Sequence, residues 1–176
     1  MRKEALGVAV AVLVVASLGV GYLAGGGRTT TVTITTTSDA YEQVANAYQA
    51  HLSQLEVRDV SALASEYESN ATIYWTGAAD DVAGNYSGST SIKILMGNFV
   101  GKSVTFSLSN ESQSLSVEGS VAVVNSTFSF VAILGAGVVN GTVAAQDVYE
   151  HAGGSSWLIA SETWNFIQLK EPFPFT

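Results

Sequence analysis

Two acidic residues, Asp147 and Glu162, are the side chains of this sequence best suited to acid–base chemistry. Each lies in a run of alternating apolar and polar residues, a pattern typical of a strand with one buried face. A carboxyl group removed from water has a raised pKa and is a candidate for proton transfer. The alternative is that a shift in register, or a place at an open rim, leaves both acids in solvent.

The inward face follows from residue parity. If Asn140 points outward to carry a glycan, residues of the opposite parity on the same strand point inward, and the last strand has a matching face. The expected inward residues are Val139, Val143, Ala145, Asp147, Tyr149 and His151 on one strand, and Leu158, Ala160, Glu162, Trp164 and Phe166 on the next.

The other reactive side chains are few. The chain has no cysteine, which excludes disulfides and thiolate metal sites. Its two histidines, His51 and His151, fall in different predicted elements, so we predict no metal site and no cofactor. Arg58 falls between two predicted helices, where a surface role is expected. Phosphate-binding loops, dinucleotide fingerprints and nucleophile motifs do not occur in the sequence.

The hydrophobic periodicity predicts helices first and long strands afterwards. Helices are expected at Asp39–Glu56, Asp59–Tyr67 and Ser89–Asn98, with a short strand at Ala71–Trp75 and a polar loop through Ser87. Later strands are expected at Ser103–Ser109, Gln113–Val117, Val121–Leu134, Val138–His151 and Trp157–Gln168.

This order of elements resembles the NTF2-like superfamily, which includes SnoaL-like and ketosteroid-isomerase-like domains. The similar stretches are YQAHLSQLEVRDVSALASEYESNAT from Tyr48, IYWTG from Ile73, YSG followed by SIKILM, and DVYEHAGGSSWLIASETWNF from Asp147. The resemblance covers residues 39–168. It implies an α+β cone, in which N-terminal helices pack in a strongly bent antiparallel sheet around a pocket.

The resemblance also bears on the pocket and on activity. It places Tyr48 and Trp75 at the pocket, where the inward parity adds Tyr149 and Trp164. The catalytic base of a ketosteroid-isomerase-like site would fall near Trp75, and an indole cannot abstract a proton. Tyr48 also fits an ordinary core position on the buried stripe of its helix. Domains of this family often dimerise through their sheets, which makes a homodimer an expectation.

The N-terminal residues predict export. Residues 5–24 carry no charge and are long enough, at about 30 Å as a helix, to cross a bilayer. Arg2 and Lys3, in a stub of residues 1–4, favour an inside N-terminus and a domain outside the cell. A cleaved signal peptide, which would give a secreted protein, is the alternative. The domain itself is expected at residues 39–169, followed by a tail at 170–176.

A Thr-rich linker and five sequons suggest a cell surface. The linker, residues 25–38, fits a polar stalk, and its alternation of Val32 and Ile34 with threonines also fits a strand donated to a neighbouring subunit. Asn-x-Ser/Thr patterns are potential glycan acceptors, and together with the single apolar segment they favour an archaeal surface. They occur at Asn70, Asn85, Asn110, Asn125 and Asn140.

Charge and motifs leave three hypotheses for function. The chain has a formal net charge of -8, which disfavours nucleic acid as a partner. The first hypothesis is a membrane-anchored, non-catalytic domain that binds a small apolar ligand or a partner protein. The second is a subunit of an extracellular filament or coat, a homopolymer joined by the donated strand. The third is a SnoaL-like enzyme that uses Asp147 or Glu162.

Overall fold

The computed structural model describes residues 37–77, 83–135 and 137–170. The predicted apolar segment 5–24, the stalk with Val32 and Ile34, and the tail from residue 171 lie outside these ranges. Within the described ranges, no helix has both the length and the hydropathy that a bilayer crossing requires.

The first predicted helix is confirmed as α2 (Thr37–Val57). The second is shorter than expected, because α3 (Val60–Ser65) ends before Tyr67, which begins a strand. Asp59 caps α3, since its carboxylate accepts hydrogen bonds from the backbone N–H groups of Ser61 and Ala62 at 3.0 and 2.9 Å. The third helix is confirmed as α4 (Gly88–Met96), and it continues into a single π-helical turn, η1 (Gly97–Gly101).

Six strands form one sheet in the order β2-β1-β6-β5-β4-β3. Their bounds are β1 Tyr67–Gly77, β2 Gly84–Ser87, β3 Thr105–Glu118, β4 Val121–Leu134, β5 Gly137–Gly153 and β6 Ser156–Leu169. The expectation of a wholly antiparallel sheet is wrong, because β1 runs parallel to β6. These two strands are far apart in sequence, so no hairpin sets their relative direction.

Two details of the predicted strands also differ. The expected strands at 103–109 and 113–117 are one strand, β3, with an irregularity between Asn110 and Ser112 that leaves its pairing with β4 intact. The stretch expected as a polar loop contains β2, which pairs with β1. Both errors have the same cause. Polar residues interrupt the apolar–polar alternation from which strands are predicted, but they do not interrupt the backbone hydrogen bonds between neighbouring strands.

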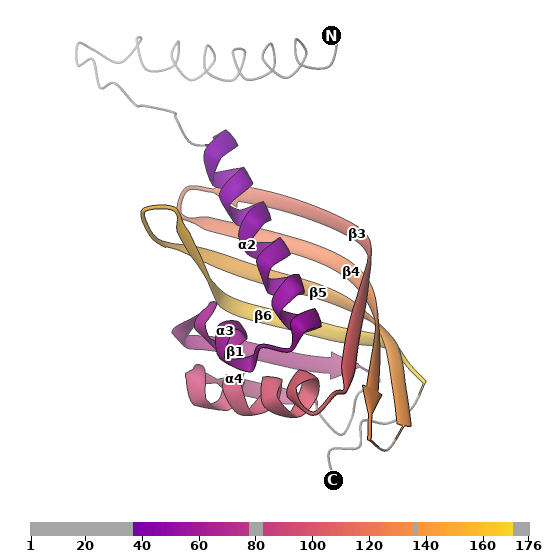
Figure 1. Ribbon diagram of the computed structural model, residues 1–176. Helices are drawn as coiled ribbons and strands as arrows, with labels where there is room; N and C mark the ends of the chain where they lie inside the picture. Colours follow the sequence, from indigo (N-terminus) through magenta and orange to yellow (C-terminus); the bar gives the residue numbers. More distant parts are fainter. Residues whose placement is uncertain (1–36, 78–82, 136, 171–176) are drawn as a thin grey trace, which may run out of the picture. The chain divides into compact units, whose positions relative to one another are not determined.

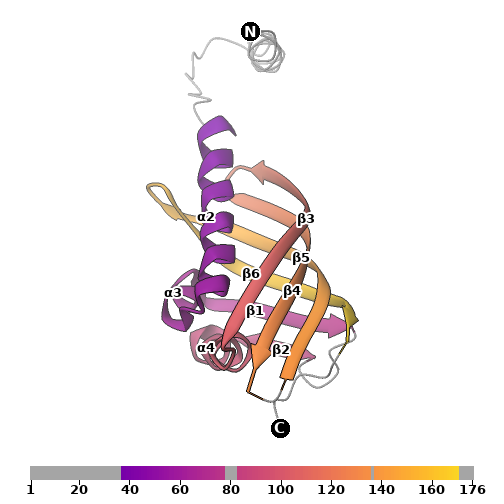
Figure 2. The ribbon, with the colours of Figure 1, turned by 45° about the vertical axis from the view of Figure 1, so that its right-hand side comes forward.

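The sheet is strongly curved, and α2 lies across its concave side (Figures 1 and 2). The buried stripe of α2 consists of Val44, Tyr48, His51 and Leu55, each at most 1% exposed. Their spacing of four, three and four residues keeps them on one face of a helix. The helix therefore presents two polar aromatic side chains to the interior of the curved sheet.

Candidate active site

The interior of the curved sheet holds two acids from neighbouring strands. Asp147 on β5 and Glu162 on β6 are a cross-strand pair, and they are 2% and 1% exposed. Both side chains point inward because the adjacent residues Gln146 and Thr163 take the outer face. The two acids are therefore not solvated, as the alternative interpretation of the sequence would require.

A histidine lies between one of these acids and a third one. His51 Nδ1 is 2.8 Å from Glu66 Oε2, and His51 Nε2 is 3.5 Å from Glu162 Oε2, which is an ion-pair distance. The same Glu162 oxygen accepts a hydrogen bond from the Tyr67 hydroxyl at 2.6 Å. The ring of Tyr67 also meets His51 edge to face, with centroids 5.9 Å apart.

Burial makes these groups titrate far from their usual ranges. Burial, reinforced by the negative charge of Glu162, raises the pKa of Asp147 well above 3.8, and His51 opposes this only in part. Burial also raises the pKa of Glu162 above 4.5, and the charge of His51 and the hydrogen bond from the Tyr67 hydroxyl offset this rise only in part. Two adjacent carboxyls of this kind titrate as a pair, with Asp147 the member that burial keeps protonated most strongly.

Three buried tyrosines lie near the two acids, and their hydroxyls keep their protons at neutral pH. Burial raises the pKa of Tyr48 to about 12. Burial and the nearby carboxyls raise the pKa values of Tyr67 and Tyr149 well above 10. All three hydroxyls are therefore hydrogen-bond donors under physiological conditions.

Seven buried polar atoms of this region have no hydrogen-bond partner among the described residues. A buried polar group without a partner costs about 1–3 kcal/mol, and native proteins contain few of them. Here they come from α2, β1, β4, β5 and β6. The atoms are Tyr48 Oη, His51 Nε2, Trp75 Nε1, Ser126 Oγ, Asp147 Oδ1, Tyr149 Oη and Glu162 Oε1. Such a concentration of donors and acceptors is suited to a small polar molecule.

Stacked indoles form an apolar boundary beside the acids. Trp75 on β1 and Trp164 on β6 are a register pair, and their rings stack at 5.0 Å with an interplanar angle of 7°. Phe99 and Phe166 pack edge-on against Trp75 at 4.8 and 5.4 Å. The position where the resemblance would put a base thus contributes an aromatic wall, while the carboxylates come from β5 and β6.

The predicted pocket residues Tyr48, Trp75, Tyr149 and Trp164 are all buried, but three other inward predictions are wrong. His151 is exposed, and its Nε2 lies 3.0 Å from the Gly154 carbonyl in the turn between β5 and β6. Leu158 and Ala160 are only half-buried, and Trp157 and Ile159 take the inner face instead. The pairing of β5 with β6 skips Ala160, and this bulge reverses the parity of the strand.

Sequence reasoning missed His51, Glu66 and Tyr67 as parts of the site. One signal was present for His51, which follows Tyr48 by three residues on the same helical stripe. Glu66 and Tyr67 were assigned to a helix, whereas they form the junction between α3 and β1. Within the described residues, no group of His, Asp and Glu side chains is arranged to coordinate a metal ion.

The sequons and Arg58 lie away from these acids. Asn70, Asn85 and Asn125 are exposed, and Asn140 is half-buried. The side chain of Asn110 is not among those that the structure describes. Arg58 is half-buried rather than a free surface residue, and its guanidinium donates a hydrogen bond to the carbonyl of Ser103.

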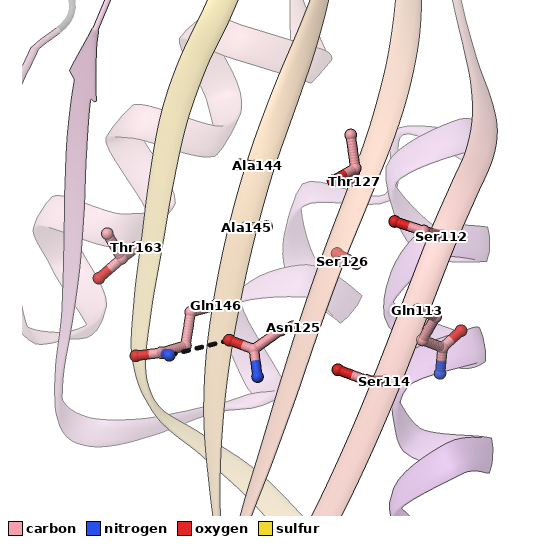
Figure 3. Close-up of a pocket in the computed structure, with 10 residues that line it drawn as sticks. All are labelled: Ser112, Gln113, Ser114, Asn125, Ser126, Thr127, Ala144, Ala145, Gln146 and Thr163. Carbon is pink, nitrogen blue, oxygen red and sulfur yellow. Dashed lines mark hydrogen bonds between the residues drawn. The ribbon is translucent and has the colours of Figure 1, made fainter.

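A groove of about 450 Å³ lies on the outer face of the sheet, and Ser126 is one of the residues that line it (Figure 3). Its lining is uncharged and consists of hydroxyls, carboxamides and alanines, with a hydrogen bond of 2.9 Å from Gln146 to Asn125. No group with a perturbed pKa lines it. The groove therefore lacks the means for acid–base chemistry, and the buried acids are the better candidate site.

Comparison with solved structures identifies the fold. An NTF2-like superfamily protein from Salmonella enterica serovar Typhimurium superposes with a TM-score of 0.66 at 15% identity, covering 77% of this chain and 96% of that one. A putative dehydratase of the NTF2-like family from Streptomyces avermitilis gives 0.66 at 18% identity, with coverages of 76% and 99%. A putative scytalone dehydratase from Novosphingobium aromaticivorans gives 0.63 at 9% identity, with coverages of 73% and 85%.

Neither protein-family models nor curated sequences match this chain. The similarity is therefore one of structure, and it shows that the chain has the α+β NTF2-like fold with a mixed, curved sheet.

Proposed function

We propose that this domain is an acid–base enzyme that moves a proton at a carbon atom of a small polar molecule. Glu162 acts as the carboxylate base and Asp147 as the protonated acid. The observation that carries the proposal is the pair of unpartnered oxygens, Glu162 Oε1 and Asp147 Oδ1, on adjacent buried side chains. Two carboxyls whose surroundings separate their proton affinities can divide the roles of base and acid.

The roles follow from the contacts of each carboxyl. Glu162 Oε2 faces two donors, the Tyr67 hydroxyl and the His51 ring, which favour its ionised form. Glu162 Oε1 is left to accept a proton. Asp147 lacks such donors at Oδ1, and burial keeps it neutral, so it can donate.

A complete cycle conserves protons. Glu162 Oε1 takes a proton from carbon as the C–H bond breaks, and Asp147 gives its proton to an oxygen of the substrate. If that oxygen leaves with the proton, the result is elimination of water. If Glu162 instead returns its proton to another carbon and the enol O–H returns its proton to Asp147, the result is isomerisation and both side chains are restored. After elimination, transfer of a proton from Glu162 to the neighbouring Asp147 restores the starting protonation of both side chains.

The aromatic side chains around the two acids suit a substrate with one polar and one apolar side. Tyr48, Tyr149 and Trp75 supply unpartnered O–H and N–H donors that can bind a substrate oxygen. The stacked pair of Trp75 and Trp164 supplies a flat apolar surface. Two proteins with the same fold are putative dehydratases, which agrees with proton chemistry but shows only the shared fold.

Access to the buried acids requires motion of α2. This helix is tied to the rest of the domain by side-chain hydrogen bonds, from Trp157 to Gln43, from Leu108 N–H to Glu56, and between His51 and Glu66. Each of these can break without disturbing the backbone ladder of the sheet. Outward movement of α2 would therefore admit the substrate while the sheet holds the two acids, and return of the helix would re-form the contacts of His51 with Glu66 and Glu162.

The test is proton abstraction from 5-nitrobenzisoxazole, a chromogenic probe whose ring opens when a base removes its C–H proton. The full chain should open the probe faster than the same concentration of acetate. A positioned base contributes about 10²–10⁴-fold, so Glu162→Gln should lose an effect of that size. Glu150→Gln, which removes an exposed acid on β5, is the matched control. Equal rates for wild type and Glu162→Gln would refute the proposal, and binding without turnover would favour a non-catalytic ligand-binding domain.

For the location of the domain, we propose export by residues 5–24, with the domain held at or released from the outer cell surface. Support comes from the uncharged apolar segment and from the exposed sequons at Asn70, Asn85 and Asn125. Protease treatment of intact cells should remove the domain, and deglycosylation should lower its mass. Protection of the domain in intact cells would contradict export.

One observation favours a second role, assembly by strand donation. β3 is a 14-residue strand at the edge of the sheet, without Pro or Lys to discourage pairing. The alternating segment around Val32 and Ile34 of another copy would fit such an edge. Replacing both residues with aspartate should abolish any polymer seen by electron microscopy. Polymers that persist in this variant would exclude this mode of assembly.

A further inference from the structure

Glu66 occupies a firmly anchored place beside the proposed base. It is the C-cap residue that follows α3, and its N–H donates to the Leu63 carbonyl at 3.1 Å. Its own carbonyl accepts a hydrogen bond from Ile159 N–H at 2.8 Å. Ile159 belongs to β6, the strand that also carries Glu162. The backbone of Glu66 is thus fixed to the same strand as the base.

His51 has a carboxylate on each side of its ring. Nδ1 lies 2.8 Å from Glu66 Oε2 and Nε2 lies 3.5 Å from Glu162 Oε2, while the His51 side chain is 2% exposed. A neutral imidazole has one N–H and can direct it at only one of these groups, whereas an imidazolium has an N–H facing each, hydrogen-bonded to Glu66 and at ion-pair distance from Glu162. The geometry therefore favours the charged ring.

The electrostatic surroundings act in the same direction. Burial lowers the pKa of His51, but the hydrogen bond to Glu66 and the charges of Glu162, Asp147 and Glu66 outweigh burial and raise it above 6.5. The ring of Tyr67 also contacts His51, and Tyr67 stays neutral because burial and Glu162 raise its pKa well above 10. Of the two carboxylates paired with His51, Glu66 lies closer, at 2.8 Å. The Glu66 side chain is 22% exposed, so it is more accessible to water than the side chains of Asp147 and Glu162.

We infer that Glu66 is a positioning residue, which holds His51 as an imidazolium with its Nε2–H directed at Glu162. This inference rests on the proposed function, since its consequence concerns the base. The imidazolium and the Tyr67 hydroxyl both face Glu162 Oε2, so they favour the ionised form of Glu162 and leave Oε1 to the substrate. The adjacent residues Glu66 and Tyr67 therefore orient the histidine and the base together.

A merely structural role for Glu66 is the competing explanation, in which the contact only fastens α2 to the domain. The two explanations differ in what happens to the charge of His51. If Glu66 positions and charges the ring, its neutralisation changes the titration of His51. If Glu66 only fastens the helix, neutralisation changes stability and leaves the titration of the ring as it was.

The test is nitrogen NMR of the histidine rings in the ¹⁵N-labelled full chain, kept in solution with detergent micelles and without substrate. The chain has two histidines, so exposed His151 serves as the internal reference. We expect an imidazolium at His51 in the wild type at neutral pH. Glu66→Gln should lower the pKa of His51 and give a neutral ring, and Glu66→Asp should restore a raised pKa in part. Glu68→Gln, two residues along and outside the cluster, should leave His51 unchanged.

A neutral His51 in the wild type, or an unchanged His51 titration in Glu66→Gln, would overturn the inference. If Glu66→Gln does not fold, the wild-type charge state and the Glu66→Asp titration still decide it. The rate with 5-nitrobenzisoxazole adds a second readout, in which Glu66→Gln should lower kcat with little change in KM. The NMR titration of His51 is measured without substrate. It therefore tests the role of Glu66 even if the protein does not catalyse proton transfer.

Discussion

Replacing Asp147 with asparagine should stabilise the domain at neutral pH, and the gain should grow as pH rises. Asp147 is 2% exposed, and burial together with Glu162 raises its pKa well above 3.8. The folded state therefore binds this proton more tightly than the unfolded state. The resulting stability is fully present below the unfolded pKa and is lost as pH rises through the folded pKa. Asparagine has nearly the same shape, never ionises and avoids this loss.

The size of the effect follows from the proton linkage. Between 3.8 and the folded pKa of Asp147, the wild type should lose about 1.4 kcal/mol of unfolding free energy per pH unit relative to the variant. Above the folded pKa the difference should level off, because both states are then ionised. For a domain of this size, each kcal/mol corresponds to about 2–8 °C in Tm.

Urea or thermal unfolding of both proteins across a pH series measures this difference. Glu150→Gln is the control, because it removes an exposed carboxylate from the same strand and should show no such growth with pH. A difference between Asp147→Asn and wild type that stays constant from acidic to mildly alkaline pH would refute the reasoning. It would mean that Asp147 is not held in its neutral form by burial. The variant should also lose activity with 5-nitrobenzisoxazole, since it has no proton to donate.

Two further predictions concern the packing and the base. Gly141→Ala should destabilise the domain by about 1–3 kcal/mol, because a Cβ there would lie 2.5 Å from the backbone oxygen of Gln168. Gly135→Ala, where a Cβ meets nothing within 4 Å, should change stability little, and similar Tm values for the two variants would contradict this packing argument. Tyr67→Phe should raise the pKa of Glu162, because it removes a hydroxyl that stabilises the carboxylate. Carbon NMR of labelled glutamate measures this shift, and an unchanged Glu162 titration would show that the hydroxyl does not tune the base.

Local patterns in the sequence were sufficient to predict several elements. Helix α2 was predictable from the helical recurrence of its apolar residues, and the long strands β4 to β6 from alternation. Asp59 was recognisable as a cap because a carboxylate before a helix accepts its first free N–H groups. The same alternation directed Asp147 inward, since parity on a regular strand is fixed by the backbone alone.

Parity failed where the backbone was irregular. The bulge at Ala160 reversed the faces of β6, so Leu158 was assigned inward although Trp157 and Ile159 are the buried residues. The position of a bulge depends on how two strands pair with each other. It could not be predicted from the residue type of Ala160. The parallel pairing of β1 with β6 could not be predicted from the sequence either, because no short turn connects the two strands.

The sequence by itself determined which residues could form helices and strands, and which acids could face inward, because these properties depend on neighbours a few positions away. Only the tertiary structure decided that His51 from α2, Glu66 from the end of α3, Tyr67 from the start of β1 and Glu162 from β6 meet at one point. Their proton affinities follow from that meeting, since burial and the distance between charges are set by contacts among residues far apart in the chain.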